Sequence, residues 1–348
     1  MAARSKPTLK DVATACGVSI GTVSYALNGK GRLDDATRAR IREAADRLGY
    51  TPNRVARGLR SGRSSTLGLL MPAPVSLPSR EVFSTDWYAQ VAMAAAEAAF
   101  HADHALLLLP AVHDAAELSR VPVDGVIVAD PHRDDPRLAV LDQLGVPTVS
   151  LGHDAAGLMR HYVAPDTKSI IRQLLDHIAE QGARRILLLT PEAGWEWARV
   201  SISTYRHWCT SQGRPSMVVT ARMPDASSAA AFEEAAYREM RRVLAEDDRP
   251  DAVVALCLGF GLGVLRAARE LGIRVPEDLL VAQDVDEPAL HSSDPPVTAV
   301  DLFPRRQATA AVQMLVSDLA GDPAQSAITI PVALRARAST RASTTPEN

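Results

Sequence analysis

The chain has 348 residues, of which 47% are hydrophobic and 23% are charged, and its formal net charge is −3. This length predicts two or three domains, and no apolar run reaches the roughly 18 residues that a transmembrane helix requires. Because the N-terminal residues also lack the apolar core of a signal peptide, we expect a cytoplasmic protein.

The charge is distributed unevenly along the chain. Residues 1–65 contain 13 Lys and Arg against 5 Asp and Glu, a charge of +8, whereas the remaining residues contain 25 against 36, a charge of −11. A basic head on an acidic body is typical of a nucleic-acid-binding domain attached to another domain. The alternative is that these charges only solvate the surface.

The basic head begins with three predicted helices. Thr8 is a candidate N-cap, Asp11 places a carboxylate in the first turn, and Ser19 caps a second helix that residues 28–29 end. A third helix is predicted over residues 35–48. The side chains expected in the shared core are Leu9, Val12, Ala13, Cys16, Val23, Ala26, Leu27, Ala36, Ile41, Ala44, Ala45 and Leu48. Two short helices joined by a glycine and closed by a third form a helix-turn-helix unit.

The run from residue 8 to residue 59 resembles the DNA-binding head of the lactose/galactose repressor (LacI/GalR) family, and the resemblance extends over the whole chain. The matching residues are Thr8-Leu9-Lys10-Asp11-Val12-Ala13, Gly17-Val18-Ser19, Thr22-Val23-Ser24, Leu27-Asn28, Thr37-Arg38, Gly49-Tyr50-Thr51-Pro52-Asn53, Ala56-Arg57 and Leu59. The resemblance implies a helix-turn-helix domain over residues 1–50, a hinge helix and tether over 51–65, an effector-sensing and dimerisation domain over 66–340, and a tail over 341–348.

The resemblance also assigns the DNA contacts of the head. The second helix is expected to enter the major groove with its N-terminal end, where the family's base-facing positions fall on Ile20, Gly21 and Tyr25. None of these reads guanine as arginine does in relatives, so we expect apolar contact with thymine methyls and use of the Tyr25 hydroxyl. Positions that match phosphate-binding or register-fixing residues are Thr8, Ser19, Thr22, Ser24, Asn28 and Thr37. The alternative for Thr22 and Ser24 is that they only stabilise helix ends.

A hinge helix is predicted from Pro52 onward. Proline suits the first turn of a helix, but about two turns are too short for stability in isolation, so the hinge should fold only with DNA and a second hinge. By resemblance, paired Leu59 side chains wedge into a central base step through the minor groove and kink the duplex. The residues implied to lie against the groove beside it are Asn53, Arg54, Ala56 and Arg57. The alternative is that Leu59 packs on the body.

From residue 66 onward, short apolar runs alternate with helical segments. The predicted strands are 67–71, 105–109, 125–129, 148–151, 185–190, 217–220, 252–256, 279–282 and 297–301. The predicted helices are 88–102, 168–181, 230–245, 263–271 and 305–319. Such alternation predicts parallel sheets with helices on both faces.

Two lobes of this kind match the periplasmic-binding-protein-like sensor of the family. Its markers lie at residues 123–127, 145–147, 271–278, 295–300 and 337–340. We therefore predict an N-terminal all-α helix-turn-helix head and an α/β sensor of two doubly wound parallel-sheet lobes. The N-lobe is expected over about 66–164 and 292–323, and the C-lobe over about 165–291 and 324–340.

An effector is expected beyond the carboxyl ends of the strands, where the two lobes face each other. The candidate residues are Trp87, Tyr88, His153, Asp166, Trp195, Trp197, Arg199, Asp284 and Asp286. By resemblance, Asp166 matches a ligand position, and Arg199 is a candidate substitute for the arginine that sugar-binding relatives carry where this chain has Ser201. The Asn-Asp of relatives is replaced in a stretch that begins with Cys257. Losing both the arginine and the Asn-Asp of relatives argues against a typical monosaccharide as the effector. For Trp195 and Trp197, the alternative is ordinary packing.

The leading hypothesis is a sequence-specific transcriptional regulator, and more narrowly a repressor, that binds a pseudo-palindromic operator in double-stranded DNA as a homodimer in the cytoplasm, at the nucleoid. A small molecule between the lobes would alter lobe closure and thereby DNA affinity. The alternatives are a regulator with a non-sugar effector or a protein co-regulator, and a stand-alone binding protein. No nucleophile–base set or metal spacing indicates an enzyme, and no cofactor is expected. Cys16, Cys209 and Cys257 are expected to be buried free thiols.

Overall fold

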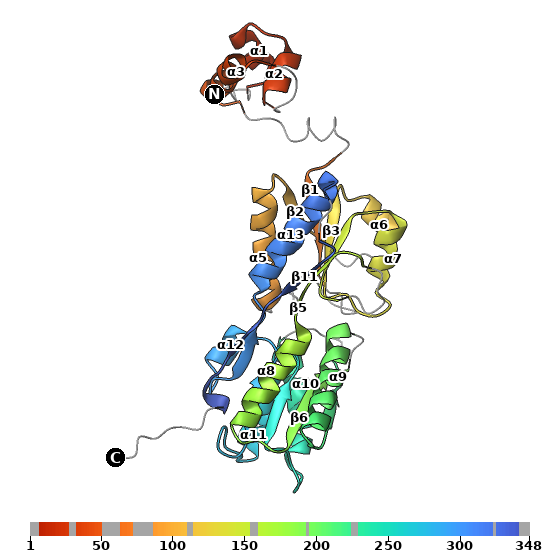
Figure 1. The fold of residues 1–348 in the computed structure, drawn as a ribbon, viewed down its shortest axis with the longest axis vertical. Coiled ribbons are helices and arrows are strands. Elements are labelled where there is room, and N and C mark those ends of the chain that lie inside the picture. The colour runs from red at the N-terminus through yellow and green to blue at the C-terminus, as the bar shows by residue number, and fades with distance from the viewer. Residues whose placement is uncertain are drawn as a thin grey trace, which may run out of the picture. The chain divides into compact units, whose positions relative to one another are not determined.

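The computed structural model describes residues 7–27, 33–50, 63–71, 86–109, 114–153, 159–192, 195–223, 229–322 and 325–340. The chain divides into two compact units, Met1–Ser64 and Ser65–Asn348 (Figure 1). No helix in these described ranges is long and apolar enough to cross a membrane.

The first unit contains the helices α1 (Leu9–Cys16), α2 (Ile20–Leu27) and α3 (Asp35–Leu48). Each helix starts at a polar cap that uses a side-chain oxygen. The contacts join Thr8 N and Oγ1 to Asp11 Oδ2 (2.7 Å each), Thr22 N to Ser19 Oγ (3.1 Å) and Thr37 N to Asp34 Oδ1 (2.7 Å). Such caps satisfy polar groups that a helix leaves without intrahelical partners at its first turn. The predicted bounds of the third helix are confirmed.

The core of this unit is formed by Val12, Ala13, Val23, Ala26, Ile41, Ala44, Ala45 and Tyr50. The prediction that Ala36 and Leu48 point into the core is wrong, because both are exposed. α3 has 14 residues, whereas α1 and α2 have eight each, so the ends of α3 extend beyond its partners. Tyr50 enters the core instead, directly after the left-handed turn at Gly49 (φ 67°).

The N-lobe of the second unit is built on a six-stranded sheet of order β11-β5-β4-β3-β1-β2, in which every pair is parallel. Its strands are β1 (Thr66–Leu70), β2 (Ala105–Leu109), β3 (Gly125–Ala129), β4 (Thr148–Leu151), β5 (Tyr162–Pro165) and β11 (Ala327–Ile330). One face is covered by α5 (Asp86–His101) and α13 (Pro304–Ala320), which lie side by side in Figure 1, and the other by α6 (Ala115–Ser119) and α7 (Pro136–Gln143).

The C-lobe is built on a second six-stranded sheet of order β12-β10-β9-β8-β6-β7, in which only β12 runs antiparallel to its neighbour. Its strands are β6 (Ile186–Pro191), β7 (Met217–Ala221), β8 (Ala252–Ala255), β9 (Leu280–Gln283), β10 (Thr298–Asp301) and β12 (Ala333–Arg335). Its helices are α8 (Thr167–Glu180), α9 (Glu196–Ser211), α10 (Ala229–Val243), α11 (Phe260–Glu270) and the short α12 (Pro288–His291).

Alternate residues of β6 show how the C-lobe sheet is covered on both faces. Leu187 and Leu189 belong to the core cluster that includes α10 and α11, whereas Ile186 and Leu188 belong to the cluster of α8 and α9. Successive side chains of a strand point to opposite faces, so a strand buried on both sides consists of apolar residues throughout. The predicted class, two doubly wound lobes with helices on both faces, is confirmed.

Two of the predicted lobe boundaries are wrong. β10 lies in the C-lobe sheet although the sequence places it in the N-lobe segment 292–323, and β11 lies in the N-lobe sheet although it falls in the predicted C-lobe segment. The chain passes between the lobes three times: between β5 and α8, between β10 and α13, and between β11 and β12. The sheet that a short strand joins depends on its partners in space, and its own four residues do not encode that choice.

Candidate functional site

The exposed face of α2 carries the side chains predicted to read DNA. Ile20 is 50% exposed and Tyr25 is 56% exposed, although both are large and mainly apolar, and Gly21 is exposed beside Ile20 in the first turn. The Ser19 cap fixes where this turn begins, and the Thr22 hydroxyl lies 2.9 Å from Ser19 Oγ. The surface opposite the core is therefore apolar and phenolic.

The other predicted DNA contacts in the head lie at helix ends or on the flank of α2. Thr8 is exposed at the cap of α1, and its hydrogen bonds lower the pKa of Asp11. Thr37 is half-buried in the first turn of α3, and Ser24 is half-buried on α2. The predicted residues Asn28, Asn53, Arg54, Ala56, Arg57 and Leu59 lie outside the described residues.

Three acidic residues near the carboxyl ends of strands form the candidate effector site, and we call them the interlobe carboxyl cluster: Asp130, Asp284 and Glu287. Asp130 follows β3 in the N-lobe, and its Oδ2 accepts a 2.7 Å hydrogen bond from the Tyr88 hydroxyl. Asp284 follows β9 in the C-lobe, and its Oδ1 accepts from the Cys257 N–H at 3.1 Å. All three acids raise the pKa of the Cys257 thiol, so negative charge from both lobes acts on one side chain.

Burial dominates the electrostatics of this cluster. It raises the pKa of Asp130 to about 6 and the pKa of Asp284 to about 7, although each accepts a hydrogen bond, and it also raises the pKa of Glu287. Burial and the neighbouring carboxylates raise the pKa of the Cys257 thiol well above its usual value. No ion pair within the described ranges joins these three carboxylates to a basic residue. Carboxyls that are partly removed from water in this way favour a ligand that donates hydrogen bonds or carries positive charge.

Aromatic and histidine side chains lie where further loops of the two lobes meet. A backbone bridge pairs His132 of the N-lobe with Trp195 of the C-lobe, and Trp195 stacks on Trp197 with ring centroids 5.6 Å apart. Burial lowers the pKa of His153, an effect that the charge of Glu196 opposes. The structure therefore brings Trp195 and His153 to the interlobe boundary, whereas Trp197 packs partly against the core beneath α9.

Two predicted effector residues have local partners. Asp166 is the N-cap of α8, and its Oδ1 accepts from the Ser169 N–H at 2.9 Å. Arg199 is exposed and pairs with Glu196 on the same helix, with Nε 2.8 Å from Oε2. Ser201, where sugar-binding relatives are expected to carry arginine, is buried. These contacts leave Arg199 as an ion-pair partner on the surface and give no support to its substitute role.

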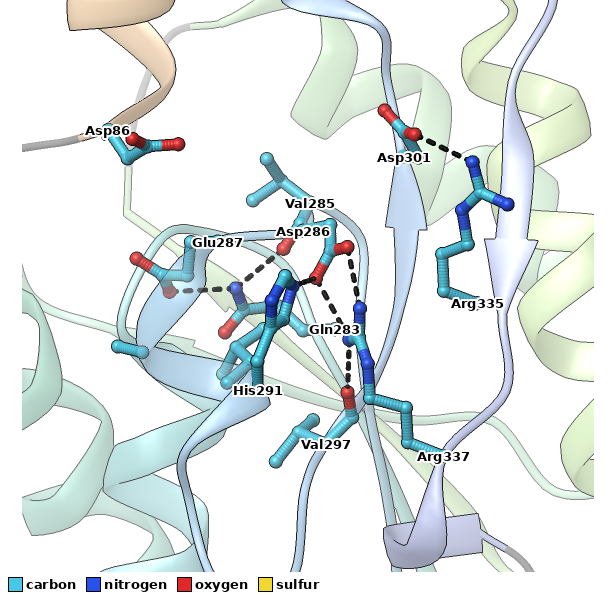
Figure 2. Close-up of polar contacts among 12 residues, drawn as sticks. Asp86, Gln283, Val285, Asp286, Glu287, His291, Val297, Asp301, Arg335 and Arg337 are labelled. Atoms are coloured by element: carbon cyan, nitrogen blue, oxygen red, sulfur yellow. Dashed lines mark hydrogen bonds and ion pairs between the residues drawn. The ribbon is translucent and has the colours of Figure 1, made fainter.

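Asp286 is held by a partner from the C-terminal segment (Figure 2). Arg337 Nη2 lies 2.7 Å from Asp286 Oδ2, and Arg337 Nη1 lies 2.9 Å from Oδ1 and 2.7 Å from the Val297 carbonyl. His291 Nε2 lies 3.1 Å from Asp286 Oδ1. The Asp286 carboxylate thus fastens the chain after β9 to the segment after β12, which is a structural role.

Sequence reasoning missed two members of the carboxyl cluster. Asp130 directly follows the predicted strand 125–129, so the rule that ligands bind beyond the carboxyl ends of strands was a sufficient signal for it. Glu287 lies four residues beyond β9 and had no comparable signal. Trp87 and Tyr88, both predicted, meet edge to face with ring centroids 4.8 Å apart, and the buried Trp87 Nε1 finds no hydrogen-bond partner among the residues that the structure describes.

Comparisons with known proteins agree with this arrangement. Residues 8–53 match the model for bacterial regulatory proteins of the lacI family, and residues 175–340 match a periplasmic binding protein-like domain. The HTH-type transcriptional regulator CelR of Thermobifida fusca is 30% identical over 335 residues, which cover 92% of this chain and 94% of the relative. The HTH-type transcriptional repressor PurR of Glaesserella parasuis serovar 5 is 25% identical over 329 residues, which cover 89% of each chain.

Two solved structures are similar over nearly the whole chain. The transcriptional regulator CelR–cellobiose complex is 27% identical with a TM-score of 0.70, covering 96% of this chain and 99% of that one. A lac repressor dimer bound to operator and an anti-inducer has a TM-score of 0.75 at 22% identity, covering 97% and 100%, and indicates a shared fold. The chain therefore belongs to the LacI family of bacterial regulatory proteins and is a DNA-binding transcriptional regulator, not an enzyme.

Proposed function

We propose that this protein is a cytoplasmic repressor that binds a pseudo-palindromic operator of nucleoid DNA as a homodimer and responds to a small molecule at the interlobe carboxyl cluster. The observation that carries the proposal is the combination, in one chain, of a head with exposed side chains on α2 and a sensor with carboxyls of both lobes in the interlobe carboxyl cluster. A ligand that changes how the lobes meet would change the spacing of two hinges, and with it the affinity for the operator.

Operator reading in this proposal rests on Ile20, Gly21 and Tyr25. Their exposure supports contact with base edges, and their chemistry favours thymine methyls together with one hydrogen bond from the phenol. Hydroxyls at the helix ends would fix the register on phosphates. Paired Leu59 side chains would then open a central base step from the minor groove.

Dimerisation is proposed to use an apolar surface of the N-lobe formed by Met93 and Phe100 of α5 with Leu108 of β2. Met93 and Phe100 are 66% and 67% exposed, and Leu108 is also exposed. The two α5 residues are seven positions apart, so they lie on the same side of the helix, and β2 is an edge strand of its sheet. Neighbouring exposed apolar side chains of this size mark an interaction surface, and one patch can meet its own copy across a two-fold axis.

The effector is proposed to be a polyhydroxy compound that donates hydrogen bonds to the carboxyl cluster. Two features support this class: half-buried acceptors at Asp130 and Asp284, and aromatic rings at Tyr88 and Trp195 on which a sugar ring can stack. The CelR relative was solved with cellobiose, so this disaccharide is the first compound to test. Two positions favour the alternative of a non-sugar metabolite or a protein co-regulator. Sugar-binding relatives are expected to carry ligand-binding residues there, whereas this chain has Ser201 and a stretch that begins with Cys257.

The DNA function is tested by enriching operator sequences from random duplexes with the full-length protein, followed by affinity measurements as a function of salt. We expect one symmetric sequence and steep salt dependence. Leu59→Ser should lose the specific affinity and keep the weak non-specific binding, whereas Tyr25→Phe, which removes one hydroxyl, should lose a smaller part. If no symmetric sequence is enriched, the dimeric operator proposal fails, and unchanged specific affinity of Leu59→Ser would contradict the hinge assignment alone.

The effector function is tested with the full chain on its enriched operator, using cellobiose, other sugars and nucleosides. A saturable change in operator affinity, with a matching rise in melting temperature, would identify the effector class because a ligand that binds only the folded state stabilises it. Asp284→Asn should weaken that response, while Asp142→Asn on α7 serves as a matched control. No response to the panel with intact operator binding would favour the alternative effector.

A further inference from the structure

The loop between β8 and α11 is held in an unusual backbone conformation. Cys257 has φ 147° and Gly259, the N-cap of α11, has φ 75°. A positive φ is costly for a residue with a side chain, so the Cys257 conformation persists only if contacts elsewhere impose it. This loop belongs to the C-lobe side of the interlobe carboxyl cluster.

Three alternate backbone N–H groups, from this loop and the first turn of α11, donate to side chains at the end of β9 and directly after it. The bonds join Cys257 N to Asp284 Oδ1 (3.1 Å), Gly259 N to Glu287 Oε1 (2.7 Å) and Gly261 N to Gln283 Oε1 (2.8 Å). Gln283 and Glu287 are both buried. The acceptors therefore replace the water that would otherwise solvate these N–H groups.

Gln283 and Glu287 also bind each other, as Figure 2 shows. Gln283 Nε2 donates to Glu287 Oε1 at 3.0 Å and to the Val285 carbonyl at 2.8 Å, so both ends of the Gln283 amide are used. A Cβ at Gly261 would come within 2.9 Å of Gln283 Oε1. Gln283 thus lies directly against the first turn of α11, where only glycine leaves enough room.

These contacts determine what the loop can offer to a ligand. The first N–H groups of a helix are free donors that commonly receive an anion, but here Gly259 N–H and Gly261 N–H already donate to Glu287 and Gln283 of the same lobe. Two further acids, Asp286 and Asp86 of α5, act electrostatically on Glu287, although Asp286 is itself paired with Arg337. An anion at this wall would meet carboxylates instead of N–H donors.

We propose that Gln283 and Glu287 are positioning residues of the effector site: they fix residues 257–261 as a preformed wall whose N–H groups at Cys257, Gly259 and Gly261 already have acidic or amide acceptors, so the effector is neutral or cationic and not an anion. This inference rests on the proposed function, in which the carboxyl cluster is the effector site. The wall would hold Asp284 in place and leave its second oxygen for the ligand.

The experiment measures alkylation of Cys257 by iodoacetamide in the full-length protein, peptide by peptide, by mass spectrometry. Cys257 lies in the wall itself, and the fully separate Cys209 in the α8–α9 core reports global unfolding. Glu287→Ala and Gln283→Ala remove acceptors, Glu287→Gln keeps an acceptor oxygen without charge, and Glu277→Gln changes an exposed acid in the turn after α11 as the matched control.

We expect Glu287→Ala and Gln283→Ala to increase Cys257 alkylation by about tenfold while Cys209 stays unchanged, because losing a buried hydrogen bond makes local opening of the loop easier. Glu287→Gln should move the pH profile of Cys257 alkylation to lower pH, because the removed charge opposes thiolate formation, and Glu277→Gln should match the wild type. Unchanged Cys257 in both alanine variants, or an equal increase at Cys209, would overturn the positioning role.

The exclusion of anions is tested by measuring Cys257 alkylation in inorganic phosphate and in chloride at equal ionic strength. Phosphate should leave Cys257 alkylation of the wild type unchanged, and protection by phosphate would overturn the exclusion of anions. These readouts need neither operator nor effector, so a failure of the proposed repressor function would appear only in the DNA measurements.

Discussion

Replacing Arg137 with methionine tests how a buried ion pair holds the N-lobe together. The side chains of Arg137 and Asp135 are 2% and 0% exposed, and Arg137 Nε lies 2.9 Å and 3.1 Å from the two carboxylate oxygens. The guanidinium also donates to the carbonyls of Met71 and Ala129, directly after β1 and at the end of β3. Burial by itself would raise the pKa of Asp135, but the hydrogen bonds and charge of Arg137 outweigh it, and the pKa is lowered.

The expected loss of stability in Arg137→Met follows from leaving the Asp135 carboxylate buried without its partner. Removing one member of a buried pair costs about 3–5 kcal/mol, and in a domain of this size 1 kcal/mol lowers the melting temperature by about 2–4 °C. Arg137→Met should therefore lower the melting temperature of the sensor by roughly 6–20 °C at pH 7. Asp135→Asn added to Arg137→Met should restore part of the loss, because asparagine keeps the N-cap of α7 and removes the unpaired charge.

The assay is calorimetric melting of the full chain, with the exposed Arg133→Met as the matched control. Because the pKa of Asp135 is lowered by folding, the stability it contributes is present above its unfolded pKa near 3.8 and is lost as pH falls through the folded pKa. The deficit of Arg137→Met should thus shrink in acid. A melting temperature at pH 7 equal to that of the control would refute the reasoning.

Three further predictions concern the head, the carboxyl cluster and the apolar surface. Thr8→Ala removes a hydroxyl bound to Asp11 and should destabilise α1 by about 1 kcal/mol, seen as faster amide exchange in that helix; unchanged exchange would contradict the cap. Folding raises the pKa of Asp284 from 3.8 to about 7, so its contribution makes the fold less stable as pH rises between those values. Asp284→Asn should therefore reduce the decrease in melting temperature between about pH 4 and pH 7. Equal decreases in the variant and the wild type would contradict a raised pKa at Asp284. Phe100→Glu should shift sedimentation from dimer to monomer, because a charge would be buried in the interface; an unchanged dimer would exclude this surface.

Several elements could be predicted to the residue. β2, β3 and β4 have the predicted bounds because short apolar runs between turn residues fit strands that helices cover. The bounds of α3 also match the prediction, because Asp34 is its N-cap and Gly49 its C-cap. By contrast, α9 was not predicted, since tryptophan and β-branched residues fill its first turns. Burial of Ala198, Tyr205 and Trp208 is what makes that segment helical.

The site was only partly predictable for the same reason. The sequence indicates that Asp284 lies near the carboxyl end of a strand and that Tyr88 is an effector candidate, but it presents Asp284 and Asp286 as equivalent acids. Arg337, 51 residues further on, pairs with Asp286 and leaves Asp284 in the cluster with Asp130 of the other lobe. Local pattern thus determined the helix-turn-helix head, the alternation of strands and helices, and the family. Only the tertiary structure decided which sheet each short strand joins and which of the two acids pairs with Arg337, because both depend on partners that are distant in sequence.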